Sequence, residues 1–264
     1  MSEERTSVLP DIITPVSNAI HQNLPETEKQ ADGALSTVVG FFNNVVLYPV
    51  KKANLTFRYK LESFEEDLKA KIRDIPAENL QVPPTMIAGP TLEALRYTYD
   101  EAELREMYEN LLASAMDNRN YTQALPSYVD AIRQMTPVDA RVLEEIANRR
   151  SIITKHIKFY ISNGSKYYPS AMPYHFCEEL VHIADSFEIS TAISNLMRLG
   201  LVRSYETFLD ENVQTAATCH EYVNSRLLYY PQGEVFARID MAGTVITLDD
   251  YGKGFIRVCL DKEI

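Results

Sequence analysis

The clearest pattern in the chain is a series of apolar positions at helical spacing between residues 79 and 146. One set falls on a single face of a predicted helix, because its members recur at positions i, i+4, i+7, i+8 and i+11. The members of this set are Leu104, Tyr108, Leu111, Leu112 and Ala115. Further helices are predicted to begin at Leu125-Pro126 and at Thr136-Pro137, since proline is tolerated at a first helical position. We therefore expect this region to consist of successive α-hairpins.

Other local signals mark expected helix starts. At Gly89-Pro90, the proline would occupy the first position of a helix. Asp100 and Glu103 have the spacing of a capping box, in which each side chain accepts a hydrogen bond from the other residue's backbone N–H. Thr136 is expected to cap the helix that follows it, with Asp139 in the first turn.

A narrow apolar stripe precedes these helices. Its members are Phe57, Leu61, Phe64, Leu68, Ile72 and Ile75, with charged residues between them. A seam this narrow packs against one neighbouring helix, either in the same chain or in a second copy. It is too short to predict a coiled coil, so we expect packing within the chain, with a dimer seam as the alternative.

The most apolar segment of the chain covers residues 33–50. A membrane-spanning helix needs about 20 predominantly apolar residues. Asn43-Asn44 in the middle of the segment and Pro49 near its end argue against spanning. We expect a buried or oligomer-interface helix, with membrane insertion as the alternative. The candidate contact residues in this segment are Phe41, Phe42, Val45 and Val46.

The second half of the chain alternates between helix and strand patterns. Residues 151–161 are rich in β-branched and aromatic side chains and fit either a helix or a strand. Helices are expected at 174–187 and 188–200, and a last helix is expected to be capped by Asp250. The expected strands cover residues 202–209, 226–230, 235–239 and 244–248.

Two motifs in this half, ISNLMRLGLV and ITLDDYGKGFIRVCL, resemble those of winged helices. The resemblance would make residues 190–198 the helix that faces a DNA groove and residues 227–239 part of the wing. That helix carries one cation, Arg198, and the residues before it are acidic, whereas DNA binding requires several Lys or Arg side chains. A structural or protein-binding winged helix is therefore favoured over one that binds DNA.

These patterns predict a mainly α protein with three parts. Residues 1–32 are expected to form a weakly ordered arm, since prolines are scattered among polar residues. Residues 33–135 are expected to form an N-terminal multi-helix domain. Residues 136–264 are expected to form a winged-helix-like α/β module with a small antiparallel sheet.

Three runs of sequence carry a family resemblance: PPTMIAGPTLEAL, ELREMYENLLASAMD and PSYVDAIRQMTPVDARVLEEI. Together and in this order they resemble the core of the abortive infection alpha family, and the similarity covers most of the chain after residue 33. The resemblance implies a mostly helical bacterial protein with a suspected part in abortive infection, the defence in which an infected cell dies or stalls. The family supplies no catalytic residues that could be transferred to positions of this chain.

Composition narrows the function classes. The net charge of -11 over 264 residues disfavours nonspecific binding to nucleic acids and to anionic membranes. Cys177, Cys219 and Cys259 are far apart and lack CxxC spacing, so a disulfide framework or a zinc ribbon is not expected. The start of the chain lacks the pattern of a signal peptide. A reducing cytoplasm is the expected location.

The chain contains no recognisable phosphate-binding loop or nucleophile elbow, so neither a catalytic site nor a cofactor is expected. One set of side chains has metal-binding chemistry: His175, Cys177, Glu178, Glu179 and His182. Glu178 and His182 would share a helix face, but a solvated pair beside a buried Cys177 explains the set with fewer assumptions, and no metal is expected. Tyr167 and Tyr168, expected in a loop, are candidate partner contacts.

The sequence thus favours a non-enzymatic protein that acts in phage defence through contact with another protein, with a homo-oligomer as one form of contact. Nucleic acid is not an expected partner. Two alternatives stay open. One is an immunity or antitoxin-like protein whose acidic balance suits a basic toxin, and the other is a membrane-active effector that uses residues 33–50.

Overall fold

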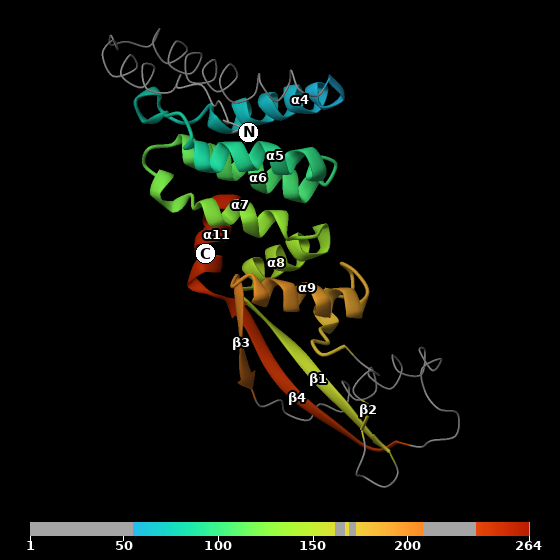
Figure 1. Cartoon of the computed structure of the whole chain (residues 1–264). Coiled ribbons are helices and arrows are strands. Elements are labelled where there is room, and N and C mark those ends of the chain that lie inside the picture. The colour runs from blue at the N-terminus through green and yellow to red at the C-terminus, as the bar shows by residue number, and fades with distance from the viewer. Residues whose placement is uncertain (1–54, 162–166, 169–172, 208–235, 264) are drawn as a thin grey trace, which may run out of the picture.

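The computed structural model describes residues 55–161, 167–168, 173–207 and 236–263. The helices form a stack with α4 at one end and the sheet at the other, where two long strands extend beyond the helices as an arm (Figure 1). The elements in chain order are α4 (Leu55–Ile72), η2 (Ala77–Asn79), α5 (Thr85–Thr98), α6 (Ala102–Met116), η3 (Tyr121–Gln123), α7 (Pro126–Arg133), α8 (Pro137–Arg149), β1 (Ser151–Ile161), β2 (Tyr167–Tyr168), η4 (Glu178–Leu180), α9 (Ser186–Arg198), β3 (Val202–Thr207), β4 (Phe236–Leu248) and α11 (Asp250–Cys259). The prediction of a mainly α protein with a small antiparallel sheet is confirmed.

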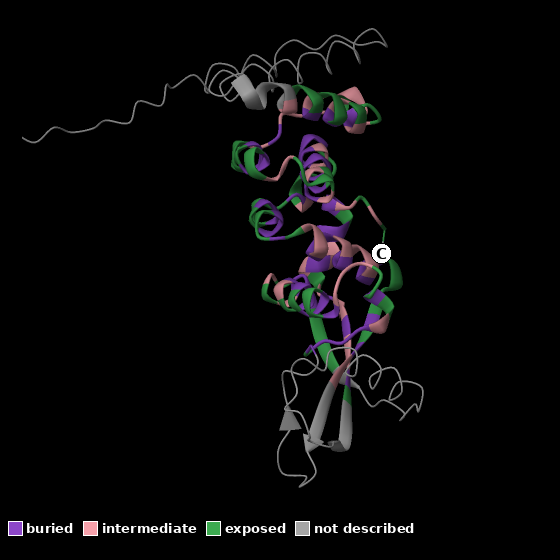
Figure 2. Ribbon diagram, turned by 90° about the vertical axis from the view of Figure 1, so that its right-hand side faces the viewer, coloured by how far each residue is buried: buried purple, intermediate pink, exposed green. Residues whose placement is uncertain are grey.

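The apolar face predicted for α6 is confirmed. This helix contacts α4, α5, α7, α8 and α11 and so lies at the centre of the stack. All five residues of the predicted face, from Leu104 to Ala115, are buried. Buried positions follow the inner faces of the helices along the whole stack, and exposed positions face outward (Figure 2). The stripe on α4 packs against α6 within the chain, since Phe64, Leu68 and Ile72 are buried there. Packing within the chain thus accounts for the described part of this stripe.

The helix start at α8 is confirmed in detail. The Thr136 hydroxyl accepts a hydrogen bond from the Asp139 backbone N–H at 3.2 Å, and the Asp139 carboxylate accepts one from the Thr136 N–H at 2.7 Å. Pro126 and Pro137 both lie in the first turns of their helices, α7 and α8. These starts could be predicted because every group involved lies within four residues of sequence.

Two other predicted start signals do not act as expected, although α6 begins within two residues of Asp100. Pro90 lies inside α5, which begins at Thr85, and it is exposed together with Met86. The carbonyl that lacks a helical partner because of Pro90 is that of Met86, on the solvent side of the helix. The box between Asp100 and Glu103 does not form, because the Asp100 carboxylate binds Lys60 Nζ at 2.6 Å instead.

The sheet is antiparallel with the strand order β2-β1-β4-β3. Residues 151–161, which fitted either a helix or a strand, form β1 along most of β4. The two strands expected at 235–239 and 244–248 are one continuous strand, β4. The inner face of the sheet is buried against the helices through Ile152, Val202, Ile246 and Leu248. The strand expected at 226–230 lies outside the described residues.

The segment before α9 also differs from the prediction. No α-helix forms over 174–185, where the 3₁₀ turn η4 is the one helical element, because two backbone hydrogen bonds of 2.7 and 3.1 Å pair Phe176 with Lys155 of β1. The helix begins only at Ser186, where Asp185 and Glu188 form a capping box. Tyr167 and Tyr168 belong to β2, paired with β1, and not to a loop.

Helix α11 returns the chain to the stack. Its cap is Asp249, one residue before the predicted Asp250. Gly252 packs so closely that a Cβ there would overlap the Leu201 carbonyl oxygen. One apolar cluster runs from Phe64 on α4 to Cys259 on α11, across the boundary that we expected between residues 135 and 136. The division into domains, like the winged-helix assignment, stays a prediction.

Candidate functional site

A polar groove of about 720 Å³ lies between α4, α6 and the C-terminal end of the chain. Its lining is mostly polar and carries charges of both signs. The lining residues with polar side chains are Lys71, Asp74, Asn110, Ser114, Asp117, Asn120, Gln123, Arg257, Asp261, Lys262 and Glu263. No predicted contact residue lies among them, so sequence reasoning missed this site.

The floor of the groove is one face of α6. Asn110, Ala113, Ser114 and Asp117 recur at intervals of three, one and three residues, which places them along the same side of the helix. The small side chains of Ala113 and Ser114 leave the space between α4 and α11 unfilled. This spacing of small and polar residues is visible in the sequence, but by itself it does not show that α4 and the tail leave space above it.

The wall opposite α4 is held by contacts from the last residues of the described chain. Asn110 Nδ2 donates to the Cys259 carbonyl oxygen at 2.9 Å, and Arg257 donates to Gln123 Oε1 at 3.3 Å. Asp261 has a left-handed backbone with φ of 52°. Lys262 binds the carboxylate of Glu144 on α8 at 2.7 Å. The tail is therefore attached to three helices, which gives the groove a defined wall.

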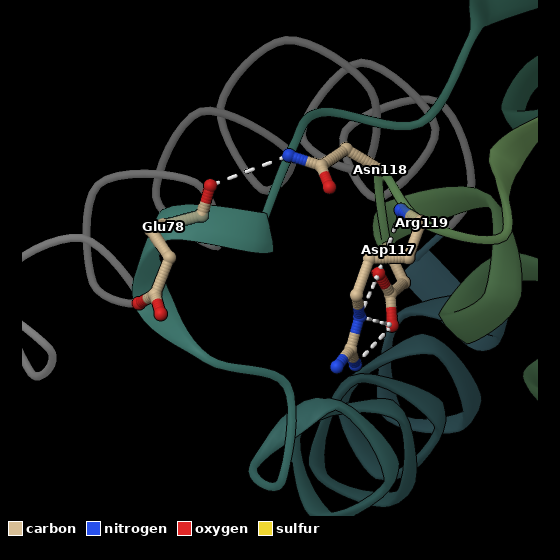
Figure 3. A network of polar contacts seen from close by, with 4 residues as sticks. All are labelled: Glu78, Asp117, Asn118 and Arg119. Atoms are coloured by element: carbon tan, nitrogen blue, oxygen red, sulfur yellow. Dashed lines mark hydrogen bonds and ion pairs between the residues drawn. The ribbon is translucent and has the colours of Figure 1, made fainter.

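Asp117, one of the lining residues, belongs to a polar network drawn in Figure 3. Asp117 is buried, and its carboxylate binds the Arg119 guanidinium at distances from 2.6 Å and the Arg119 backbone N–H at 2.9 Å. The side-chain hydrogen bond to Arg119 is the largest factor that lowers the pKa of Asp117. Asn118 Nδ2 donates to the Glu78 carbonyl oxygen at 3.3 Å, and its backbone N–H donates to Asn79 at 2.8 Å. The Asp117 carboxylate is therefore held in place and already bonded within the chain.

Glu109 is a buried acid on α6, next to the groove residue Lys71. Its nearest cations are distant for ion pairs, with Lys71 at 3.9 Å and Arg105 at 3.6 Å. The pKa of Glu109 is raised to about 7, mainly by burial and next by Asp67, while Lys71 and Arg105 oppose the rise. The α4–α6 contact thus contains a carboxyl group that changes charge near neutral pH.

The set with metal-binding chemistry does not converge. Glu178 begins a short 3₁₀ turn and binds Lys155 at 2.8 Å, while Glu179 binds Arg149 at 3.2 Å. His175 is buried, and its backbone N–H donates to Ser190 Oγ at 3.0 Å. Cys177 is buried, and burial raises the pKa of its thiol to about 11. Among the described residues, no three His, Cys, Asp or Glu side chains are placed to hold a metal ion.

The predicted contact residues fall in three places. Phe41, Phe42, Val45 and Val46 lie outside the described residues. Tyr167 and Tyr168 lie at the far end of the arm, paired with Tyr160 and Phe159. Arg198 is exposed, but its guanidinium donates to Gln134 Oε1 at 3.0 Å and to Asn195 Oδ1 at 2.8 Å. Arg198 therefore links the end of α9 to the turn between α7 and α8.

A membrane-spanning helix needs about 20 predominantly apolar residues. None of the helices in the described ranges combines the length and apolar character needed to cross a bilayer. The apolar segment 33–50 lies outside those ranges.

Comparison with known proteins identifies the family. No curated protein and no solved structure gives a significant match to the chain. The family model of abortive infection alpha matches residues 56–259, which includes α6, the groove floor and the whole sheet. The family suggests a role in abortive infection and phage defence. The chain therefore belongs to the abortive infection alpha family.

Proposed function

We propose that this protein acts in the cytoplasm as a non-enzymatic component of abortive infection and works by binding another protein. The observation that carries the proposal is the family match over residues 56–259. The net charge of -11 is in keeping with a protein partner, since nucleic acids and anionic membranes attract basic surfaces.

The groove on α6 is the surface that we assign to this contact. Several of its charged side chains are already bonded within the chain, as in the pairs Asp117–Arg119 and Lys262–Glu144. Such charges hold the groove in shape and are poorly placed to act as general acids or bases. An open groove with both signs of charge and small residues on its floor suits a polar polypeptide segment.

The experiment is a phage challenge of cells that carry the gene with its natural neighbours. The test variant is Ser114→Arg, which fills the groove from its floor. The matched control is Ser63→Arg, at an exposed position of α4 outside the groove. We expect Ser114→Arg to abolish protection and Ser63→Arg to retain it, while both variants melt like the natural protein.

Two results would count against the proposal. If the natural gene gives no reduction in plaques and no early death or arrest of infected cells, the defence role is wrong. If Ser114→Arg protects as well as the natural protein, the groove is not the contact surface. Loss of protection together with a lowered melting temperature would call for Ala113→Gln as a milder filling variant.

A second candidate is an immunity-like protein that binds a basic toxin. The excess of acidic over basic residues favours this candidate, because opposite net charges on two proteins accelerate their association and stabilise the encounter complex. We expect a basic partner to co-purify at equal stoichiometry when the neighbouring genes are co-expressed, and to dissociate at high salt. A complex whose yield does not change with salt would contradict this candidate.

The winged-helix prediction supports a binding role without DNA. In the sequence, α9 lies between β1 and β3. In the sheet, β4 lies between these two strands. Residues 190–198, the helix predicted to face a DNA groove, carry one cation, Arg198. Its guanidinium is bonded to Gln134 and Asn195. We therefore expect no salt-sensitive gel shift with DNA from the protein's own promoter.

A further inference from the structure

Strand β3 forms one edge of the sheet. The order β2-β1-β4-β3 leaves it paired with β4 alone, and no described residue forms a backbone hydrogen bond with its outer edge. Figure 1 shows β3 on the side of the sheet away from β1. Arg203, Ser204 and Tyr205 are exposed. An edge of this kind presents backbone donors and acceptors to any strand that can align with it.

An apolar row on the outer face of the sheet leads to this edge. Ile153 of β1 is paired with Val245 of β4, and Val245 is paired with Tyr205 of β3. Ile153 is 43% exposed and Tyr205 is 47% exposed. The row therefore crosses three strands without cover from the helices, which lie against the opposite face.

The edge has only some of the features that usually prevent strand pairing. Natural edge strands are often interrupted by proline, lysine or a β-bulge. The sequence of β3, VRSYET, carries the charged residues Arg203 and Glu206 but contains neither proline nor lysine, and its register with β4 is unbroken from Val202 to Thr207. Within the described ranges, this six-residue edge is therefore open for pairing.

The edge is complementary to itself. Consider two antiparallel strands related by a two-fold axis perpendicular to the sheet. Residues that face each other then have their side chains on the same face of the sheet. An axis at Ser204 therefore places Arg203 of one copy opposite Tyr205 of the second copy. The Arg203 guanidinium already lies 5.3 Å from the ring centroid of Tyr205 in its own chain. Pairing would add the same type of contact twice across the axis and would join two apolar rows.

We propose that β3 is a homodimer interface, in which two copies of the chain pair antiparallel through their outer edges about an axis at Ser204. The occupant is a second copy because the edge supplies both the cation and the aromatic ring that the pairing needs. This interface differs from the dimer seam considered for α4 and does not depend on the proposed role in defence.

The test uses a cysteine on the predicted axis in the full chain. Facing residues of antiparallel strands have Cα atoms about 4.5–5.5 Å apart, within the range that a disulfide can bridge. In a background with Cys219→Ser, Ser204→Cys should form a covalent dimer under mild oxidation at low protein concentration. Met86→Cys is the control, because Met86 is exposed on α5 and far from the sheet. Cys177 and Cys259 are buried and stay in both proteins.

Sedimentation of the unmodified protein provides the second measurement. We expect a reversible dimer, with a dissociation constant raised roughly tenfold by Arg203→Gln, because two cation–π contacts are lost for each dimer. Arg133→Gln, at an exposed position of α7, should leave the constant unchanged. A monomer at all concentrations would overturn the proposal. So would a dimer in which Ser204→Cys does not cross-link, or cross-links no better than Met86→Cys.

Discussion

The helical stack and the sheet differ in how completely their apolar residues are covered. In the stack, Phe64, Tyr108 and Leu111 are fully buried because α6 has neighbours on several sides. In the sheet, Ile152 and Ile246 are buried on the inner face while Ile153 remains largely exposed on the outer one. The comparison suggests that the stack supplies stability and that the sheet retains surface for contacts.

Polar groups differ between the two regions as well. The stack contains a buried acid, Glu109, with no short ion pair, and a buried Tyr108 hydroxyl without a hydrogen-bond partner among the described residues. In the sheet, the Thr154 hydroxyl donates a hydrogen bond to the Thr244 carbonyl oxygen at 3.3 Å. The stack therefore tolerates unfavourable polar burial, which its large apolar cluster offsets.

The largest expected effect comes from the core of the stack. Phe64→Ala should lower the free energy of unfolding by about 3–5 kcal/mol, because it leaves a cavity between α4 and α6. Denaturant unfolding measures the change. Met86→Ala, at a position 63% exposed, is the control and should change stability by less than about 0.5 kcal/mol. Equal effects at the two positions would mean that α4 does not pack as described.

A close contact joins the two regions. Gly252→Ala should destabilise the protein by about 2–4 kcal/mol, since its Cβ overlaps the Leu201 backbone and α11 must shift. Gly89→Ala has open space around its Cβ and should be neutral or stabilise α5 by about 0.5–1 kcal/mol. Thermal and denaturant melts of both variants separate a packing effect from a backbone effect. A neutral Gly252→Ala would contradict the close contact.

The buried acid gives the stack a pH dependence. The pKa of Glu109 rises from 4.5 to about 7 on folding, so its favourable contribution is complete below pH 4.5 and is lost as the pH rises through 7. Glu109→Gln should therefore be more stable than the natural protein at pH 8 by about 1–3 kcal/mol, with little difference at pH 4.5. The exposed Glu93→Gln is the control. Parallel stability curves for the natural protein and Glu109→Gln would disprove the burial of an ionisable group.

The smallest expected effect lies on the outer face of the sheet. Ile153→Thr keeps a β-branched side chain at an exposed strand position and should change stability by less than about 0.5 kcal/mol. The same substitution at Ile152, which is 1% exposed, should cost about 1–3 kcal/mol. Unfolding of the monomer at low protein concentration measures both. If the two positions respond alike, the sheet is covered on both faces.

Sequence reasoning succeeded where the deciding contacts are local. The apolar face of α6 and the box between Thr136 and Asp139 depend on groups within one or two helical turns, and both were predicted. It failed at Asp100 because the carboxylate has a distant alternative, Lys60, forty residues earlier in the chain. The groove could not be predicted, since it exists only where α4, α6 and the tail leave a gap above small residues.

Periodicity and caps were therefore sufficient to predict a mainly helical chain with a small sheet near the C-terminus, and the resemblance of three sequence runs indicated the family. They could not decide whether residues 151–161 form a helix or a strand, because that choice depends on pairing with β4, about ninety residues later. Nor could they decide that α11 packs onto α6, or which sheet face stays open. These features arise from contacts between distant segments, whose free energy appears only when the chain has folded and the segments meet.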